Sequence, residues 1–292
     1  MAAPSGPPRR TINRVAVWAA APILAQLKQC GTTVNRLPAL AAQARARLLK
    51  MHFQTRSGHV GGNLSCLDAL IALHHGVMQE DDRFVLSKGH SAGALYVTLW
   101  SLGRLSDADL DTFSQDDSLL PGHPSGSGIP GLMFSTGSLG HGPSLAAGLA
   151  LAARHQGSSR RVYCLCSDGE WQEGSCWEAL SFAVHHRLDN LTLLIDQNGL
   201  QGFGSTQDVV SCPDLGPRLQ AFGAQVQRAN GHDPDALAQI LHQPAAGAPT
   251  VLVLDTVKGL GTHYAGLLES HYLPLAEAEY EQAIAFGSDA AR

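Results

Sequence analysis

Residues 162–199, VYCLCSDGEWQEGSCWEALSFAVHHRLDNLTLLIDQNG, decide the fold. Two uninterrupted apolar runs, Val162–Cys166 and Leu191–Ile195, predict strands, and residues 174–186 between them predict a helix. Uninterrupted apolar strands are typical of a parallel sheet that helices cover on both faces. The stretch therefore predicts a strand–helix–strand unit of an α/β protein.

Similar segments flank this unit on both sides. Ser65 is interpreted as the N-cap of a helix over 66–75, and the glycine- and proline-rich residues 120–142 predict a long functional loop. No internal repeat is found, so we expect one doubly wound, mostly parallel α/β domain over residues 37–292. Further strands are expected at 83–86, 224–227 and 250–254, and further helices at 40–53, 91–102, 145–154, 215–222 and 234–241.

The first 36 residues are predicted to be a disordered N-terminal extension. Residues 1–10 are rich in proline, glycine and arginine, and the apolar stretch 15–27 resembles the core of a signal peptide. However, Pro22 interrupts this stretch, Lys28 follows it, and no small-residue cleavage site is found. A disordered extension is therefore favoured over a signal peptide.

Composition excludes several classes of protein. The net charge of the 292 residues is −5, whereas a nucleic-acid surface needs a basic excess. No apolar run reaches the ~18 residues that a membrane span requires. The 6 cysteines contain no C-x-x-C pair, and they are interpreted as buried free thiols of a cytoplasmic protein.

Polar residues follow four of the expected strands, at 87–90, 167–170, 196–199 and 255–259. Ligands of open parallel sheets bind at the carboxyl ends of the strands. Asp168 and Asn198 follow neighbouring strands, which places two oxygen ligands side by side for Mg²⁺. Gly169 leaves room for a diphosphate to approach the main chain. An Asp-Gly pair alone is also a common turn, so only the combination predicts a metal and diphosphate site.

These residues and five surrounding motifs resemble transketolase, a family of thiamine-diphosphate (ThDP) enzymes. An Asp-Gly pair that is followed by Asn about thirty residues later is similar to the metal–diphosphate motif of ThDP enzymes. The resemblance covers about residues 37–275, and its motifs occur in transketolase order. The five motifs are RSGHVGG at 56–62, RFVLSKGH at 83–90, PGHP at 121–124, STGSLGHG at 135–142, and EG at 173–174 followed by WEA at 177–179.

The resemblance implies a ThDP-binding fold and roles for individual residues. Asp168, Asn198 and the carbonyl of Leu200 are the implied ligands of Mg²⁺ or Ca²⁺. His59 and His123 are implied to act at the reactive centre, and Glu173 in a proton network between two active sites. The residues implied to bind the cofactor are His90, Gly137, Ser138, Leu139, Asp168, Gly169, Glu170, Asn198 and His271.

The length of the chain, about half that of a full transketolase, points to a split enzyme. The resemblance then implies an N-terminal subunit whose active site is completed by a separate C-terminal transketolase-like subunit, in a heterotetramer with two copies of each. The expected reaction transfers a two-carbon ketol unit from a ketose phosphate to an aldose phosphate.

Two alternatives remain: a non-catalytic scaffold subunit with the ThDP fold, and the α-subunit of a 2-oxo-acid dehydrogenase-like enzyme. Three departures from the family also matter. Ser167 replaces the usual glycine, the residues around His271 differ, and residues 196–204 are closer to split forms attached to specialised sugar pathways. These departures leave the donor and acceptor sugars open. The remaining histidines of the expected helices are interpreted as surface residues: His74, His75, His155, His185 and His186.

Overall fold

The computed structural model describes residues 36–290 except 127, 130, 212, 213, 244 and 246. The predicted disordered extension lies outside the described residues apart from Arg36, which begins the first described helix. Of the cysteines, Cys30 and Cys212 also lie outside them. The others, Cys66, Cys164, Cys166 and Cys176, are buried and free, as the sequence predicts.

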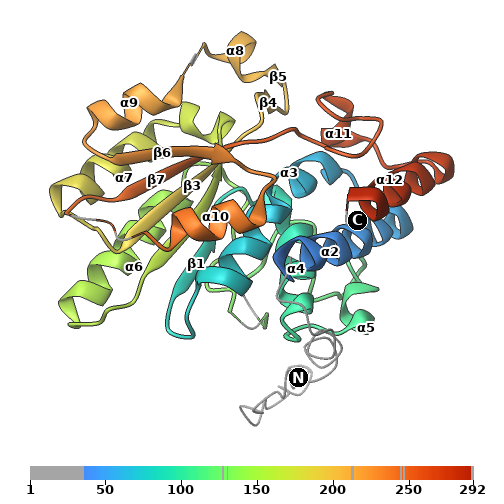
Figure 1. Cartoon of the computed structure of the whole chain (residues 1–292), viewed down its shortest axis with the longest axis horizontal. Helices are drawn as coiled ribbons and strands as arrows, with labels where there is room; N and C mark the ends of the chain where they lie inside the picture. The colour runs from blue at the N-terminus through green and yellow to red at the C-terminus, as the bar shows by residue number, and fades with distance from the viewer. Residues whose placement is uncertain are drawn as a thin grey trace, which may run out of the picture.

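A five-stranded sheet forms the centre of the molecule, with all neighbouring strands parallel (Figure 1). The strand order β1-β2-β3-β7-β6 starts with β1 at one edge, passes to β6 at the other edge after β3, and returns to β7, so the winding direction reverses once, as expected of a doubly wound sheet. The strands are β1 (Arg83–Leu86), β2 (Val162–Ser167), β3 (Leu191–Gln197), β6 (Gln225–Asn230) and β7 (Thr250–Asp255).

Helices cover both faces of the sheet because alternate strand residues point to opposite sides. On β2, Tyr163 and Leu165 join one buried core, whereas Val162, Cys164 and Cys166 join the other. The first core is built with α2 (Arg36–Thr55), α3 (Val60–Ile71), α4 (Ala92–Ser101) and α10 (Pro234–Leu241), and the second with α6 (Gly142–His155), α7 (Gly174–His185) and α9 (Leu215–Ala221).

Shorter elements complete the described chain. A two-stranded antiparallel hairpin, which the sequence did not predict, joins β4 (Leu200–Gln201) to β5 (Gly204–Ser205). A capping box at Ser106 starts α5 (Asp107–Leu110). The others are the 3₁₀ turns η2 (Gly89–Ser91) and η3 (Gly169–Gln172), and the helices α8 (Thr206–Val209), α11 (Glu269–Tyr272) and α12 (Glu277–Ala290).

The predicted N-cap at Ser65 is wrong. Helix α3 begins five residues earlier, at Val60, and the residue before it, His59, has a left-handed backbone with φ of 65°. Ser65 is completely buried inside the helix, where its hydroxyl donates to the carbonyl of Gly62 and to Asp196. A serine can satisfy its hydroxyl within a helix in this way, so the residue type alone did not locate the start of the helix.

Two histidines that we expected on the surface are partly buried. His74 and His75 lie in the π-helical turn η1 (Ala72–Val77), which changes the positions of residues around the helix axis. The His74 ring packs edge-on against Phe84 with 4.9 Å between ring centroids, and Nε2 of His75 lies 2.8 Å from the hydroxyl of Ser101. For these two residues the surface interpretation is therefore wrong.

Within residues 36–290, as far as they are described, no helix is both long enough and apolar enough to cross a bilayer.

Candidate active site

The polar strand ends meet at one edge of the sheet, as predicted. The backbone N–H of Asp168 donates to the carbonyl of Asp196 (3.1 Å), and that of Thr256 donates to Gln197 (3.3 Å). A cavity of about 370 Å³ opens at this edge. Its lining includes ten of the thirteen predicted site residues: His59, His90, His123, Gly137, Leu139, Gly169, Glu173, Asn198, Leu200 and His271.

The three predicted metal ligands lie together at one end of this cavity. Asp168 accepts backbone N–H bonds from Gly169 (2.8 Å) and from Gly199 (2.6 Å), next to Asn198. The side-chain oxygen of Asn198 accepts from the backbone N–H of Leu200 (3.1 Å). Burial, and then the charge of Asp196, raise the pKa of Asp168 to about 6. A divalent cation would favour the charged carboxylate, so this oxygen-rich group fits a Mg²⁺ site.

Four histidines gather in the same lining. The centroid of the His59 ring lies 4.6 Å from that of His271, and 5.7 Å from those of both His90 and His123. Burial is the main reason that the pKa values of all four are lowered, to about 4 for His59, to about 3 for His271 and well below the usual value for His90. Neutral imidazoles can accept or donate a proton, so this group is suited to proton transfer.

The backbone at His59 is strained and held in place. Its φ of 65° is unusual for a residue other than glycine, and such strain costs about 1–3 kcal/mol. The N–H of His59 donates to the carbonyl of His271 (2.9 Å). A side chain at Gly58 would lie 2.8 Å from the carbonyl oxygen of Tyr272, so the two segments pack without space between them. This packing fixes the direction in which His59 points.

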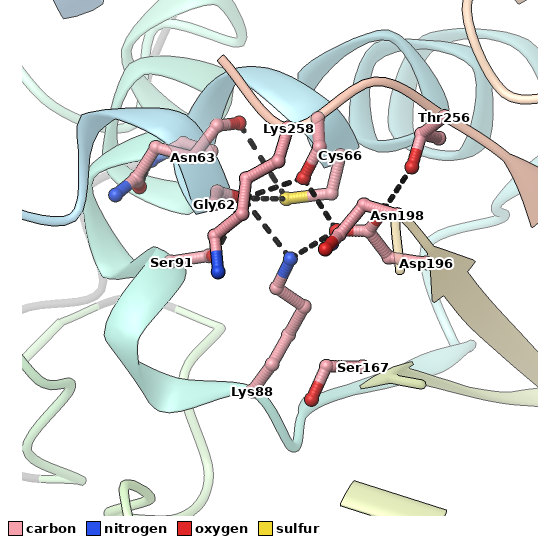
Figure 2. Close-up of polar contacts among 12 residues, drawn as sticks. Gly62, Asn63, Cys66, Lys88, Ser91, Ser167, Asp196, Asn198, Thr256 and Lys258 are labelled. Carbon is pink, nitrogen blue, oxygen red and sulfur yellow. Dashed lines mark hydrogen bonds and ion pairs between the residues drawn. The ribbon is translucent and has the colours of Figure 1, made fainter. Parts of the chain in front are cut away.

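A cluster of four polar residues, called here the ion-pair cluster, lies beneath the metal end of the cavity (Figure 2). Lys88 and Asp196 form an ion pair and are both completely buried. Ser65 and Thr256 also donate to the Asp196 carboxylate, and Nζ of Lys88 donates to the carbonyl of Gly62 (3.0 Å). The cluster joins helix α3 to the ends of three strands, because its members come from four segments of the chain.

Lys258 is a site residue that the sequence interpretation missed. It is only 2% exposed, and no carboxylate of a described residue forms an ion pair with it. Its Nζ donates to the carbonyl of Leu200 (3.1 Å) and lies 3.2 Å from Nδ1 of His271. Burial, and then the charge of Lys88, lower the pKa of Lys258 to about 8. Its position before Gly259, just after a strand end, was the available signal.

Three predicted residues do not line the cavity: Ser138, Asp168 and Glu170. Asp168 is 6% exposed, and its carboxylate accepts from the backbone N–H of the next residue, the lining residue Gly169. The carboxylate of Glu170 is completely buried and accepts from the backbone N–H of Gly140 (2.8 Å) and of Ser167 (3.2 Å). Both carboxylate oxygens of Glu170 are therefore bound inside the protein, and its predicted contact with a cofactor stays a prediction.

The mouth of the cavity is apolar on the side of the β4–β5 hairpin. Phe203, at the tip of this hairpin, is 87% exposed, and Tyr272 is 53% exposed. The Tyr272 hydroxyl donates to the carbonyl of Gly202 and so holds the hairpin beside α11. The sequence interpretation missed this rim because the unpredicted hairpin forms it; Gln172, Gln201, Gly202, Phe203 and Tyr272 are its additional lining residues.

Comparisons with known proteins agree with this geometry. The family described as "Transketolase, thiamine diphosphate binding domain" matches residues 39–291. The chain is 37% identical over 264 residues to one subunit of apulose-4-phosphate transketolase from Phocaeicola vulgatus, covering 86% of this chain and 93% of that protein. It is 38% identical to the 6-deoxy-6-sulfo-D-fructose transketolase subunit SqwG from Clostridium sp., covering 78% of this chain and 87% of that protein.

Solved structures give the same result at the level of the fold. Transketolase from Leishmania mexicana superposes with a TM-score of 0.81 at 30% identity, over 87% of this chain and 41% of that protein. The chain thus spans about two fifths of the length of this full transketolase. The predicted family, α/β fold and enzyme class are confirmed: the chain belongs to the transketolase family and corresponds to its thiamine-diphosphate-binding domain.

Proposed function

We propose that the chain binds ThDP with Mg²⁺ and works as the N-terminal subunit of a split transketolase. One observation supports this most directly. The cavity lining brings together a first set of groups, the oxygen ligands and a buried ammonium group that pairs with no described carboxylate, and a second set, the neutral histidines. A metal-bound diphosphate requires the first set of groups, and proton transfer at a reactive carbon requires the second.

Each end of the proposed cofactor has residues that fit it. Asp168, Asn198 and the Leu200 carbonyl would hold the metal, and Lys258, whose charge no described carboxylate balances, would neutralise part of the diphosphate charge. His90 and His271 would donate to diphosphate oxygens. Gly137 and Leu139 would line the aminopyrimidine ring, with a carbonyl acceptor and an apolar surface respectively.

The bound cofactor would supply carbanion stabilisation, which amino-acid side chains cannot provide. His59 and His123 would then move protons to and from the hydroxyl groups of the sugar. Both are neutral at pH 7 because burial lowers their pKa values. Their neutral form is the one that accepts a proton. Glu173, which is exposed beside the cavity, would link this site to a second one.

A separate C-terminal transketolase-like subunit would complete the site. Two of the relatives are named as single subunits of a transketolase, and this chain matches most of the length of each. The exposed apolar rim at Phe203 and Tyr272 is suited to burial against such a partner. Two copies of each chain would form a heterotetramer. A cytoplasmic location is part of the proposal, because the four described cysteines are free thiols.

The test is reconstitution of ketol transfer from xylulose 5-phosphate to ribose 5-phosphate, with ThDP and Mg²⁺. We expect turnover only when the chain is mixed with its C-terminal partner, and a loss of at least about 100-fold in the Asp168→Ala variant. Asp81→Ala, which changes an exposed carboxylate outside the cavity lining, is the matched control. ThDP binding without turnover would indicate different sugars, whereas neither binding nor turnover would support the scaffold alternative.

A further inference from the structure

The buried carboxylate of Glu170 connects two parts of the cavity lining. Its Oε1 accepts from the backbone N–H of Gly140 (2.8 Å) and from the hydroxyl of Ser87. Its Oε2 accepts from the backbone N–H of Ser167 (3.2 Å), at the end of β2. The Ser87 hydroxyl in turn accepts from the backbone N–H of Gly142 (3.1 Å). One carboxylate therefore holds the loop over residues 136–142 to the ends of β1 and β2.

The same loop packs against these strand ends without room for side chains. A Cβ atom on Gly142 would lie 2.2 Å from Cβ of Ser87, and one on Gly89 would lie 2.7 Å from the backbone of Thr136 and Gly137. On the other side, Ser175 donates to the carbonyl of Gly140 (3.0 Å). Small shifts of the loop are thus resisted by close backbone contacts, and its hydrogen bonds to Glu170 and Ser87 fix which position it takes.

The two parts held together by Glu170 contribute different residues to the cavity lining. The loop places Gly137 and Leu139 in the lining, and a Cβ atom on Gly137 would lie 3.0 Å from the His123 ring. The end of β2 leads directly into Asp168 and Gly169 at the metal end. The distance between the two parts therefore depends on the bonds that Glu170 accepts.

We propose that Glu170 is a positioning residue: its carboxylate sets the aminopyrimidine-lining loop at a fixed distance from the metal and diphosphate end of the site. This inference rests on the proposed function, since it concerns the binding of ThDP as one rigid body across both ends. Both carboxylate oxygens of Glu170 accept from donors of the protein itself. Its effect reaches the cofactor through Gly137 and Leu139.

The replacement Glu170→Gln keeps the size of the side chain but exchanges one acceptor oxygen for an NH₂ donor. The N–H groups of Gly140 and Ser167 and the hydroxyl of Ser87 then face a side chain that has only one acceptor oxygen, the other position being an NH₂ donor. In either orientation of the amide, a buried N–H or hydroxyl group loses its acceptor, and the loop or the strand end must shift. Ser87→Ala removes the single hydroxyl that joins Glu170 to Gly142, which is a smaller change at the same connection.

The experiment compares two ligands by calorimetry in the reconstituted complex, with Mg²⁺ present. ThDP spans both ends of the site, whereas inorganic pyrophosphate occupies only the diphosphate end. For Glu170→Gln we expect the dissociation constant of ThDP to rise about tenfold, the equivalent of ~1.4 kcal/mol, while that of pyrophosphate stays within about twofold. Ser87→Ala should change the ThDP value in the same direction by about threefold.

Controls separate this role from a general loss of structure. Glu281→Gln changes an exposed glutamate on α12 and should leave both constants unchanged. Equal losses for ThDP and pyrophosphate, or unchanged ThDP affinity in both variants that fold, would overturn the positioning role. If the unmodified complex binds no ThDP, the proposed function fails and the role of Glu170 fails with it. If Glu170→Gln does not fold, Ser87→Ala alone decides the question.

Discussion

Lys88 and Lys258 are two buried lysines at the same edge of the sheet, and they differ in their surroundings (Figure 2). Burial alone would lower the pKa of Lys88, but the charge of Asp196 raises it above its ordinary value. Lys258 has no ion pair with any described carboxylate, and its pKa falls to about 8. The first lysine is neutralised by the fold, whereas the second remains to be neutralised by a ligand.

The difference separates stability from function within one polar region. A buried ion pair that is fully hydrogen-bonded holds its segments together, and loss of one partner is costly. A buried charge without a partner lowers stability and persists where binding requires it. We therefore expect substitutions in the ion-pair cluster to act mainly on folding and substitutions at Lys258 to act mainly on cofactor binding.

Loss of Lys88 should have the largest effect on stability. Lys88→Met leaves the Asp196 charge buried without its ammonium partner, and we expect a decrease of about 3–5 kcal/mol in the free energy of unfolding. Urea denaturation measures this decrease, with the exposed Lys50→Met as the matched control. The double variant Lys88→Met/Asp196→Leu should recover much of the loss. A change below about 1 kcal/mol in the single variant would break the distinction between the two lysines.

Replacement of Lys258 should have the opposite effect on stability. Lys258→Met removes a buried charge and should raise the free energy of unfolding by about 1–3 kcal/mol, while ThDP binds at least about tenfold more weakly. The folded pKa of about 8 lies below the unfolded value of 10.5. Protonation of Lys258 therefore favours the unfolded state. Below pH 8 the substitution raises the free energy of unfolding by its full amount.

The pH dependence tests this explanation directly. Between pH 8 and pH 10.5 the ammonium group of Lys258 loses its proton first in the folded state, so the stability of the unmodified chain rises relative to Lys258→Met. The stability difference between the two should shrink to near zero over this interval. A difference that is independent of pH would mean that packing of the methionine, rather than charge, explains the gain.

Acid should destabilise the chain through the cavity histidines, with the smallest effect per residue. The pKa of His59 is about 4 in the folded chain against 6.5 when unfolded. The unfolded state therefore binds more protons between these values, and stability falls as the pH drops from about 6.5 toward 4. Because His59 is partly exposed, we expect a loss of about 1 kcal/mol at pH 5 from this residue.

The variant His59→Asn checks that contribution, since asparagine tolerates the left-handed backbone at this position. Its unfolding free energy, measured by urea denaturation at pH 7 and pH 5, should decrease less than that of the unmodified chain. His155→Asn, on the exposed end of α6, is the control and should show the full decrease. Identical decreases in all three proteins would exclude His59 as a source of acid sensitivity.

Local sequence patterns were sufficient for much of the fold and the site. The apolar runs at 162–166 and 191–195 cannot be exposed, and their continuity requires cover on both faces, so they predicted a parallel sheet. The polar residues after them had to meet at one edge, because parallel strands end on the same side. Asp168 and Asn198 could be located in this way, whereas the resemblance to the transketolase family was needed to locate His59, His123 and His271.

Other features depend on contacts between segments that are distant in the sequence. Ser65 has a typical N-cap side chain but is buried beside Asp196, 131 residues away. His74 packs against Phe84 instead of lying on the surface, because it lies in a π-helical turn and not in a regular α-helix. The Glu170 side chain points inward because its carboxylate accepts hydrogen bonds from Gly140 and Ser87. Both donors are distant in the sequence, so no local pattern near Glu170 could predict them.

The sequence by itself thus determined the sheet, the edge at which ligands bind and the kinds of groups gathered there. Only the tertiary structure decided which of two similar lysines has a partner and which acidic residue faces inward. The physical reason is that periodicity and residue type report local burial and chemistry. Pairing of buried charges depends instead on distances between segments, such as those that carry Lys88 and Asp196, 108 residues apart.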